Sequence, residues 1–184
     1  AALIAVMARA GYVVATDERR ERAADNLVDN LRTIAELCRE RGVPLVLCTL
    51  ASNERGFAPA RGIPPIADEL RWAALLAAGE RDREPQKALI ALAEAQILSD
   101  EDAYLHFLRG VHLERLGISA EAQRAYVRAR DLDPRPWRAT DALNDIVRRV
   151  AAKEGALLAD VTARLRAASP PAGIGWELMV DHLH

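Results

Sequence analysis

The sequence predicts an α/β protein: part of a three-layer α/β/α core around a parallel sheet, interrupted by an all-helical insertion. Two short apolar runs, residues 43–50 and 156–161, each follow a helical pattern and a glycine. A helix, a glycine and a short apolar run are typical of the second half of a βαβ unit, whose strand is buried on both faces. Between the two runs, helical patterns follow one another over residues 60–136. We therefore divide the chain into residues 1–59 and 137–184, which form the core, and residues 60–136, the insertion.

Composition and charge exclude several classes of function. The chain has 184 residues and a formal net charge of −2, which gives no electrostatic reason to expect a nucleic-acid partner. No apolar run approaches the roughly 20 residues that a membrane span needs. Cys38 and Cys48 are ten residues apart, one in a helical and one in an extended pattern, so they are expected to be small apolar residues rather than a metal or redox pair. No cofactor or metal is expected.

The first core segment contains a long amphipathic helix, an apolar run and a loop in which ligand-binding residues are expected. Helical patterns cover residues 1–10 and 19–41, and Gly42 ends the second helix. Ligands of parallel sheets bind beyond the carboxyl ends of the strands, where residues 51–59 form a loop. Asn53 and Arg55 are the candidate substrate-loop residues here. The alternative for Asn53 is an ordinary turn residue.

Residues 60–136 have an internal period of 34 residues, with units at 69–102 and 103–136. A helix-turn-helix unit of this length is typical of tetratricopeptide repeats, in which small residues let helices pack closely. The second unit resembles that family through residues spaced as the family has them: Gly110, Gly117, Ala122, Tyr126, Ala129 and Asp133-Pro134. The first unit adds Trp72-x-x-Leu75. His106 and Arg109 depart from the pattern, since large apolar residues are expected there.

The histidines of the insertion are not expected to bind metal. His106 and His112 are six residues apart, which places them on different faces of a helix. Pairs that bind metal prefer a spacing of three or four residues. Both are therefore predicted to be structural or surface residues.

The last segment returns to helices and strands and ends in an acid–base motif. Thr140 can cap a helix that runs to about residue 153, and a short helix over residues 162–168 follows the second apolar run. After a stretch rich in proline and glycine, the chain ends on Asp181-His182-Leu183-His184. An aspartate three residues before a histidine can supply the base of a serine hydrolase and the carboxylate that orients it. Two solvated polar residues near a chain end are the plainer alternative.

These elements together resemble the C-terminal part of an SGNH (GDSL-type) hydrolase that carries inserted tetratricopeptide repeats. The resemblance lies in residues 42–47, Ser52-Asn53, Arg138-Ala139, Asn144, Ser169-Pro170 and, above all, residues 177–184. It implies that Asp181 and His184 belong to the catalytic set, whereas His182 has no assigned role. It also implies an ester-containing substrate: a small molecule, a lipid or an acylated glycan.

The sequence departs from that family in lacking the Gly-Asp-Ser block that carries the nucleophile. Asn53 is not expected to be the family's oxyanion asparagine, because it follows a later strand. The chain opens on Ala1 inside a helical pattern, so we treat it as a piece of a longer protein whose serine lies upstream. On its own the piece is expected to be inactive.

Two other functions remain open. The repeats could make the chain a scaffold that binds a peptide or protein in the repeat groove, beside a degenerate α/β flank. Alternatively, they could only stiffen an enzyme or shape its entrance. The sequence does not separate these alternatives.

Overall fold

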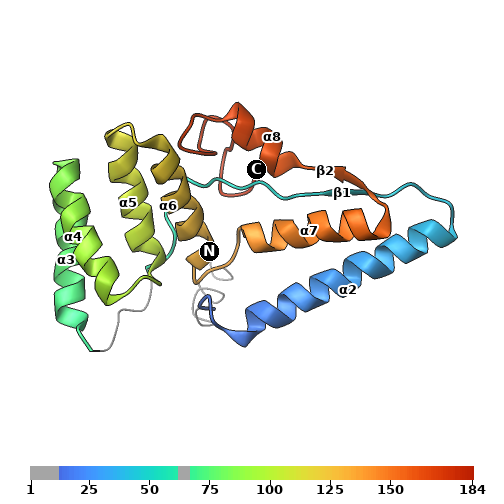
Figure 1. The fold of residues 1–184 in the computed structure, drawn as a ribbon, viewed down its shortest axis with the longest axis horizontal. Coiled ribbons are helices and arrows are strands. Elements are labelled where there is room, and N and C mark those ends of the chain that lie inside the picture. Colours follow the sequence, from blue (N-terminus) through green and yellow to red (C-terminus); the bar gives the residue numbers. More distant parts are fainter. Residues whose placement is uncertain (1–12, 62–66) are drawn as a thin grey trace.

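The computed structural model describes residues 13–61 and 67–184 and shows a mostly helical protein (Figure 1). Within the described residues there are seven helices and two strands. The helix predicted over residues 1–10 lies outside them. The described elements form two helical groups, α2 with α7 and α3 to α6, joined by long extended segments (Figure 1).

The predicted three-layer α/β/α core is wrong. The two apolar runs form strands of only three residues, β1 (Val46–Cys48) and β2 (Leu157–Ala159), which pair in parallel with Val46 opposite Leu157. Only Leu47 of β1 is buried, while Val46 and Leu157 are 51% and 63% exposed. The apolar runs predict strands buried on both faces, but helices cover one face of this sheet and leave the other open. An apolar run shows that a segment favours an extended, desolvated conformation; it does not show that the covering layers exist.

The covered face of the sheet packs on α7 (Asp141–Glu154), which in turn packs against α2 (Glu18–Glu40). Thr140 caps α7 as predicted, accepting a hydrogen bond from the backbone N–H of Leu143, and Gly155 ends the helix with a φ of +70°. The shared core consists of apolar side chains from both helices and β1: Ala24, Leu27, Val28, Leu31, Leu47, Ile146, Val147, Val150 and Ala151. A short helix, α8 (Val161–Ala168), follows β2.

The second group contains four consecutive helices in an antiparallel array. They are α3 (Glu69–Arg81), α4 (Pro85–Leu98), α5 (Ala103–Arg115) and α6 (Ser119–Leu132). Glycines allow close packing within each pair: a Cβ on Gly79 would lie 2.5 Å from Leu92, and one on Gly110 would lie 2.6 Å from Tyr126. Each glycine therefore accommodates a large side chain of the next helix. We call this group, residues 69–132, the helical module.

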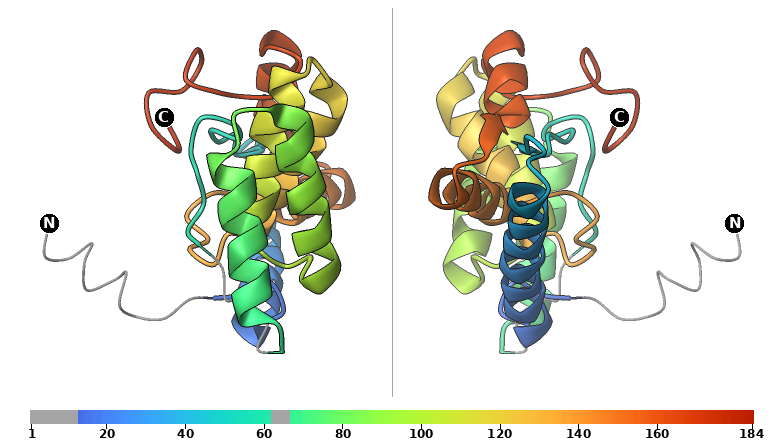
Figure 2. Two further views of the ribbon diagram at one scale, coloured as in Figure 1. Left: turned by 90° about the vertical axis from the view of Figure 1, so that its left-hand side faces the viewer. Right: turned by 90° about the vertical axis from the view of Figure 1, so that its right-hand side faces the viewer.

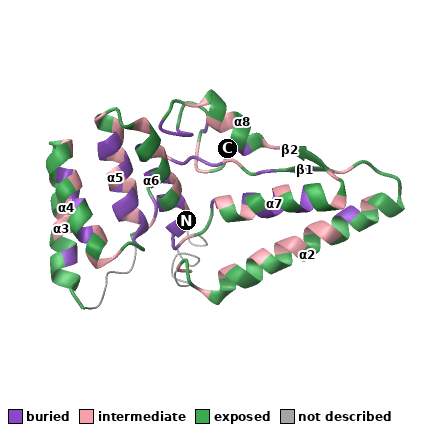
Figure 3. Cartoon of the chain, viewed as in Figure 1, coloured by how far each residue is buried: buried purple, intermediate pink, exposed green. Residues whose placement is uncertain are grey.

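Two long segments without regular structure lie beside the module. One runs from the end of β1 to residue 61, and the other follows α8 to the C-terminus. Figure 2 shows both on the same side of the helices, in teal and red. Burial is high where they meet the module (Figure 3): Ser52, Asn53, Glu54 and Ile174 are all at most 1% exposed. This junction positions the candidate site.

Candidate active site

The end of β1 is fixed by hydrogen bonds to the elements that follow in the other half of the chain. The Thr49 hydroxyl donates to Asp160 Oδ1 at 2.9 Å and accepts from the Thr162 N–H at 3.0 Å. Asn144 of α7 bonds to both the N–H and the carbonyl oxygen of Leu50. The loop after β1 therefore leaves the sheet in a defined direction.

Asp181 and His184 form a hydrogen-bonded pair at the C-terminus. His184 Nδ1 lies 2.9 Å from Asp181 Oδ2, and Asp181 Oδ1 accepts the backbone N–H groups of Leu183 and His184, both at 2.7 Å. The side chain of His184 is 76% exposed. The pair is thus closed by a tight local turn, which we call the C-terminal turn (residues 181–184).

The contacts of Asp181 keep its carboxylate ionised. The hydrogen bond from His184 and those from the amides of Leu183 and His184 hold the pKa of Asp181 far below its ordinary value. Because Oδ2 of an ionised carboxylate can only accept, His184 Nδ1 carries the proton in the neutral ring. His184 Nε2 is then the nitrogen with a free lone pair, and no described side chain forms a hydrogen bond with it.

Asn53 is hydrogen-bonded to the C-terminal turn. Its backbone N–H donates to the carbonyl oxygen of His182 at 3.1 Å, and its Nδ2 lies 3.4 Å from the carbonyl oxygen of Asp181. Its Oδ1 accepts the N–H of Gly56 at 2.7 Å. Asn53 is fully buried, and both the oxygen and the nitrogen of its side-chain amide form hydrogen bonds. It therefore supports the C-terminal turn and does not face solvent.

The side chain of Arg55 bonds to residues outside the C-terminal turn. Nη1 lies 3.0 Å from Glu114 Oε1 of α5, Nη2 lies 2.6 Å from Glu177 Oε2, and Nε donates to the carbonyl oxygen of Gly173 at 3.1 Å. Its donors therefore connect the helical module to the C-terminal segment. The structure brings Asp181, His184 and Asn53 together, and it joins Arg55 to Glu114 and Glu177.

Two residues at this site, His182 and Arg138, were not among the predicted site residues, although Arg138 contributed to the resemblance. His182 lies between two aromatic rings, with centroid distances of 5.2 Å to Phe57 and 5.6 Å to Trp137. Buried Arg138 donates to the carbonyl oxygens of Asn53 and Phe57 and pairs with Asp133 at 2.9 Å. The chain has only two phenylalanines and three tryptophans, so Phe57 and Trp137 are conspicuous in the sequence. Their spacing, however, does not show that both rings lie beside His182.

Glu54, which belongs to the loop after β1, is the centre of an ion cluster. Glu54 Oε1 accepts from Arg130 of α6 at 3.0 Å and from Arg166 of α8 at 2.6 Å. Arg130 and Arg166 also share Asp141 Oδ1, at 2.9 and 2.8 Å. The side chains of Glu54 and Arg130 are at most 1% exposed, so each charge depends on its partners for compensation.

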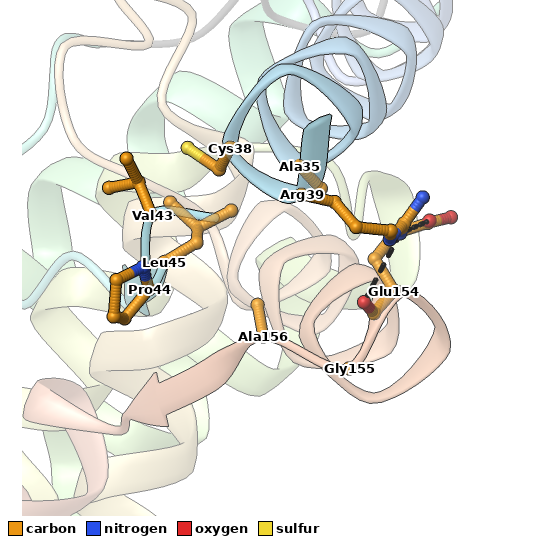
Figure 4. A pocket seen from close by; sticks show the side chains of 9 residues that line it. All are labelled: Ala35, Cys38, Arg39, Val43, Pro44, Leu45, Glu154, Gly155 and Ala156. Carbon is orange, nitrogen blue, oxygen red and sulfur yellow. Dashed lines mark hydrogen bonds and ion pairs between the residues drawn. The ribbon is translucent and has the colours of Figure 1, made fainter. Parts of the chain in front are cut away.

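Two of the hollows in the surface differ in their relation to the candidate site. One of about 190 Å³ lies between the end of α2 and the start of β2, beside the Arg39–Glu154 ion pair (Figure 4). None of the candidate site residues lines it. Another of about 150 Å³ is lined by both aromatic partners of His182, Phe57 and Trp137, together with Asp133, Arg135 and Arg138. This second hollow is therefore the one beside the candidate site.

No protein-family model matches the sequence, and neither does any curated protein or solved structure. Within residues 13–61 and 67–184, no group of three or more His, Cys, Asp or Glu side chains is arranged to hold a metal ion. No helix of this part of the chain is long and apolar enough to cross a membrane.

Proposed function

We propose that Asp181 and His184 supply the base of a serine ester hydrolase of the SGNH type. The observation that carries the proposal is the 2.9 Å contact between Asp181 Oδ2 and His184 Nδ1, together with the exposure of the imidazole. An oriented imidazole whose Nε2 is free and accessible is what a hydroxyl nucleophile requires of its base.

In this mechanism, His184 moves one proton in each half-reaction. Nε2 takes the proton of a serine hydroxyl as its oxygen bonds to the ester carbonyl carbon, and Asp181 stabilises the imidazolium that forms. His184 then gives the proton to the departing alkoxide oxygen. Water attacks the acyl-enzyme in the same way and releases the acid, so the histidine ends neutral.

The nucleophile is proposed to come from polypeptide upstream of this sequence, since no Gly-Asp-Ser block occurs here. Ser52 is a poor candidate for that role, because it is 1% exposed and its hydroxyl has no hydrogen-bond partner among the described residues. The proposed substrate class is an ester-containing small molecule, a lipid or an acylated glycan. The hollow beside Phe57 and Trp137 is the proposed place for its apolar or ring portion.

A second candidate is a scaffold that binds a peptide or protein through the helical module. It is favoured by a face on α3 and α5 that combines carboxylates with aromatic rings, at Glu80, Tyr104 and Glu114. It is weakened because the chain's own residues 55–61 already contact that face.

Ester hydrolysis by the protein extended upstream to include a Gly-Asp-Ser block tests the first candidate. We expect His184→Ala to lower kcat/KM by about 10⁶-fold and Asp181→Asn by about 10⁴-fold, by analogy with triads in which base or carboxylate was removed. Asp25→Asn, an exposed aspartate on α2 with no described partner, is the matched control. Undiminished hydrolysis by the His184 variant, or an upstream sequence without a serine block, would contradict the proposal.

A further inference from the structure

The extended segment after β1 lies along the face of α5. Arg55 contacts Glu114 near the C-terminal end of α5, and Arg61 lies over the ring of Tyr104 near its N-terminal end, 4.7 Å from the centroid. Next to Arg61, the N–H of Ala60 donates to Oδ1 of Asp133, the residue that follows α6, at 3.3 Å. Residues 55–61 therefore run antiparallel to α5 over most of its length.

The face that receives this segment matches its chemistry. Tyr104, Phe107, Val111 and Glu114 are spaced three, four and three residues apart, which places them on one side of α5. The ring of Phe107 lies 6.2 Å from that of Tyr104 and 5.7 Å from that of Tyr126.

Two glutamates on this face pair with the arginines of the segment. Glu114 pairs with Arg55, and Glu80 of α3 pairs with Arg61 at 3.0 Å while accepting the Tyr104 hydroxyl at 2.8 Å. Carboxylates and aromatic rings suit guanidinium groups, so both arginines of the segment meet suitable partners.

The same segment also holds the C-terminal turn. Arg55 reaches Glu177 and the carbonyl oxygen of Gly173 with the donors that Glu114 leaves free, and its N–H donates to Ile174. Two residues earlier, Asn53 holds His182. A continuous set of contacts thus runs from α5 through Arg55 and Asn53 to the turn that carries His184.

We propose that the helical module recognises residues 55–61 of its own chain as a peptide ligand and in this way positions the Asp181–His184 pair. Glu114 and Arg55 are positioning residues in this scheme. The face of α3 and α5 is filled from within the chain, so it is not a docking site for a peptide of another protein. The inference does not require His184 to be catalytic.

Amide hydrogen exchange on the described chain tests the positioning. Glu114→Gln is expected to speed exchange at Asn53 and Arg55 roughly tenfold, since it weakens a charge-assisted hydrogen bond, while amides of α4 keep their rates. Tyr126→Phe is the matched control, because it removes the hydrogen bond to the other oxygen of the same carboxylate, Oε2, and leaves Arg55 paired. Unchanged rates at Asn53 and Arg55, or an equal increase across the whole module, would overturn the proposal.

Two further measurements cover the far anchor and the occupancy of the face. Arg61 is exposed, so Arg61→Gln is expected to leave the protein folded and speed exchange at Ala60 several-fold. A fluorescent peptide with the sequence of residues 53–62 is expected to show no saturable binding to the wild-type protein. An unchanged rate at Ala60, or saturable binding of that peptide, would contradict occupancy by the chain's own segment.

Discussion

The Glu54 cluster and the C-terminal turn are both polar, yet they differ in what their polar groups leave free. Around Glu54, Arg130 and Arg166 are paired with Glu54, Asp131 and Asp141; Glu54 and Arg130 are buried, and the other three side chains are partly exposed. In the turn, the Asp181–His184 pair is exposed, and the Asp181 carboxylate is satisfied while one ring nitrogen of His184 is left open. A network in which every charge is paired around a buried Glu54–Arg130 contact stabilises the fold, whereas an oriented imidazole with a free lone pair in water can take part in chemistry.

The largest effect is expected at Glu54. Glu54→Gln removes the buried one of the two carboxylates that Arg130 and Arg166 share, and removing one partner of a buried ion pair costs about 3–5 kcal/mol. We expect the free energy of unfolding to fall by about 3 kcal/mol or more, measured by urea denaturation. Glu36→Gln, at an exposed position on α2, is the control. A loss no greater than that of the control would mean that the cluster is not structural.

A smaller effect is expected at Asn53, which lies between the two regions. Asn53→Ala removes the acceptor of the Gly56 N–H and the donor to Asp181, and an unsatisfied buried group costs about 1–3 kcal/mol. Urea denaturation should show that loss, and the imidazole resonances of both His182 and His184 should shift. Asn30→Ala, at an exposed position on α2, should do neither. Unmoved histidine resonances would separate Asn53 from the turn.

The buried histidines of the module predict a pH dependence. Burial lowers the pKa values of His106 and His112 below their ordinary value of 6.5. Nε2 of His112 donates to the carbonyl oxygen of Gly79, so protonation would place a second N–H on Nδ1, which has no partner among the described residues. The unfolded chain therefore binds more protons than the folded chain, and stability falls as the pH drops below 6.5.

Urea denaturation at pH values from 7.5 down to about 5 measures this effect above the range in which carboxylates titrate. The double variant His106→Asn, His112→Gln is expected to flatten the dependence. A wild-type stability that is constant or rises as the pH falls over this range would show that these rings are not held neutral by burial.

The smallest effect on stability is expected at Asp181. Both members of the Asp181–His184 pair are exposed, and exposed pairs contribute little to folding. Asp181→Asn should leave the urea midpoint close to that of the wild type, although the same substitution is expected to abolish most of the proposed activity. A large loss of stability would assign the pair a structural role like that of the Glu54 cluster.

Local features of the chain could be predicted from sequence. Thr140, Gly155 and the apolar stripe of α2 act through neighbours within a few residues, and their patterns correctly placed α2 and α7. The 34-residue period likewise corresponds to four packed helices. The Asp181–His184 contact is also local, because His184 comes three positions after Asp181 in the sequence.

The layers of the sheet and the junction could not be predicted in the same way. The burial of Leu47 but not Val46 depends on which face the helices cover, a choice that alternation in so short a run does not encode. Glu54 is separated by 76 residues from Arg130 and by 112 from Arg166, so no spacing rule connects them. The partners of Arg55 are likewise distant in the sequence, because Glu114 and Glu177 lie 59 and 122 residues after it.

The tautomer of His184 tests the central claim most directly. Nitrogen-15 NMR of the imidazole in the described chain distinguishes a ring protonated at Nδ1 from one protonated at Nε2. We predict that, in the neutral ring, the proton lies on Nδ1, that Nε2 is the unprotonated acceptor, and that Asp181→Asn removes this preference. A neutral ring protonated mainly at Nε2, or a preference unaffected by Asp181→Asn, would contradict the assignment of His184 as a base oriented by Asp181.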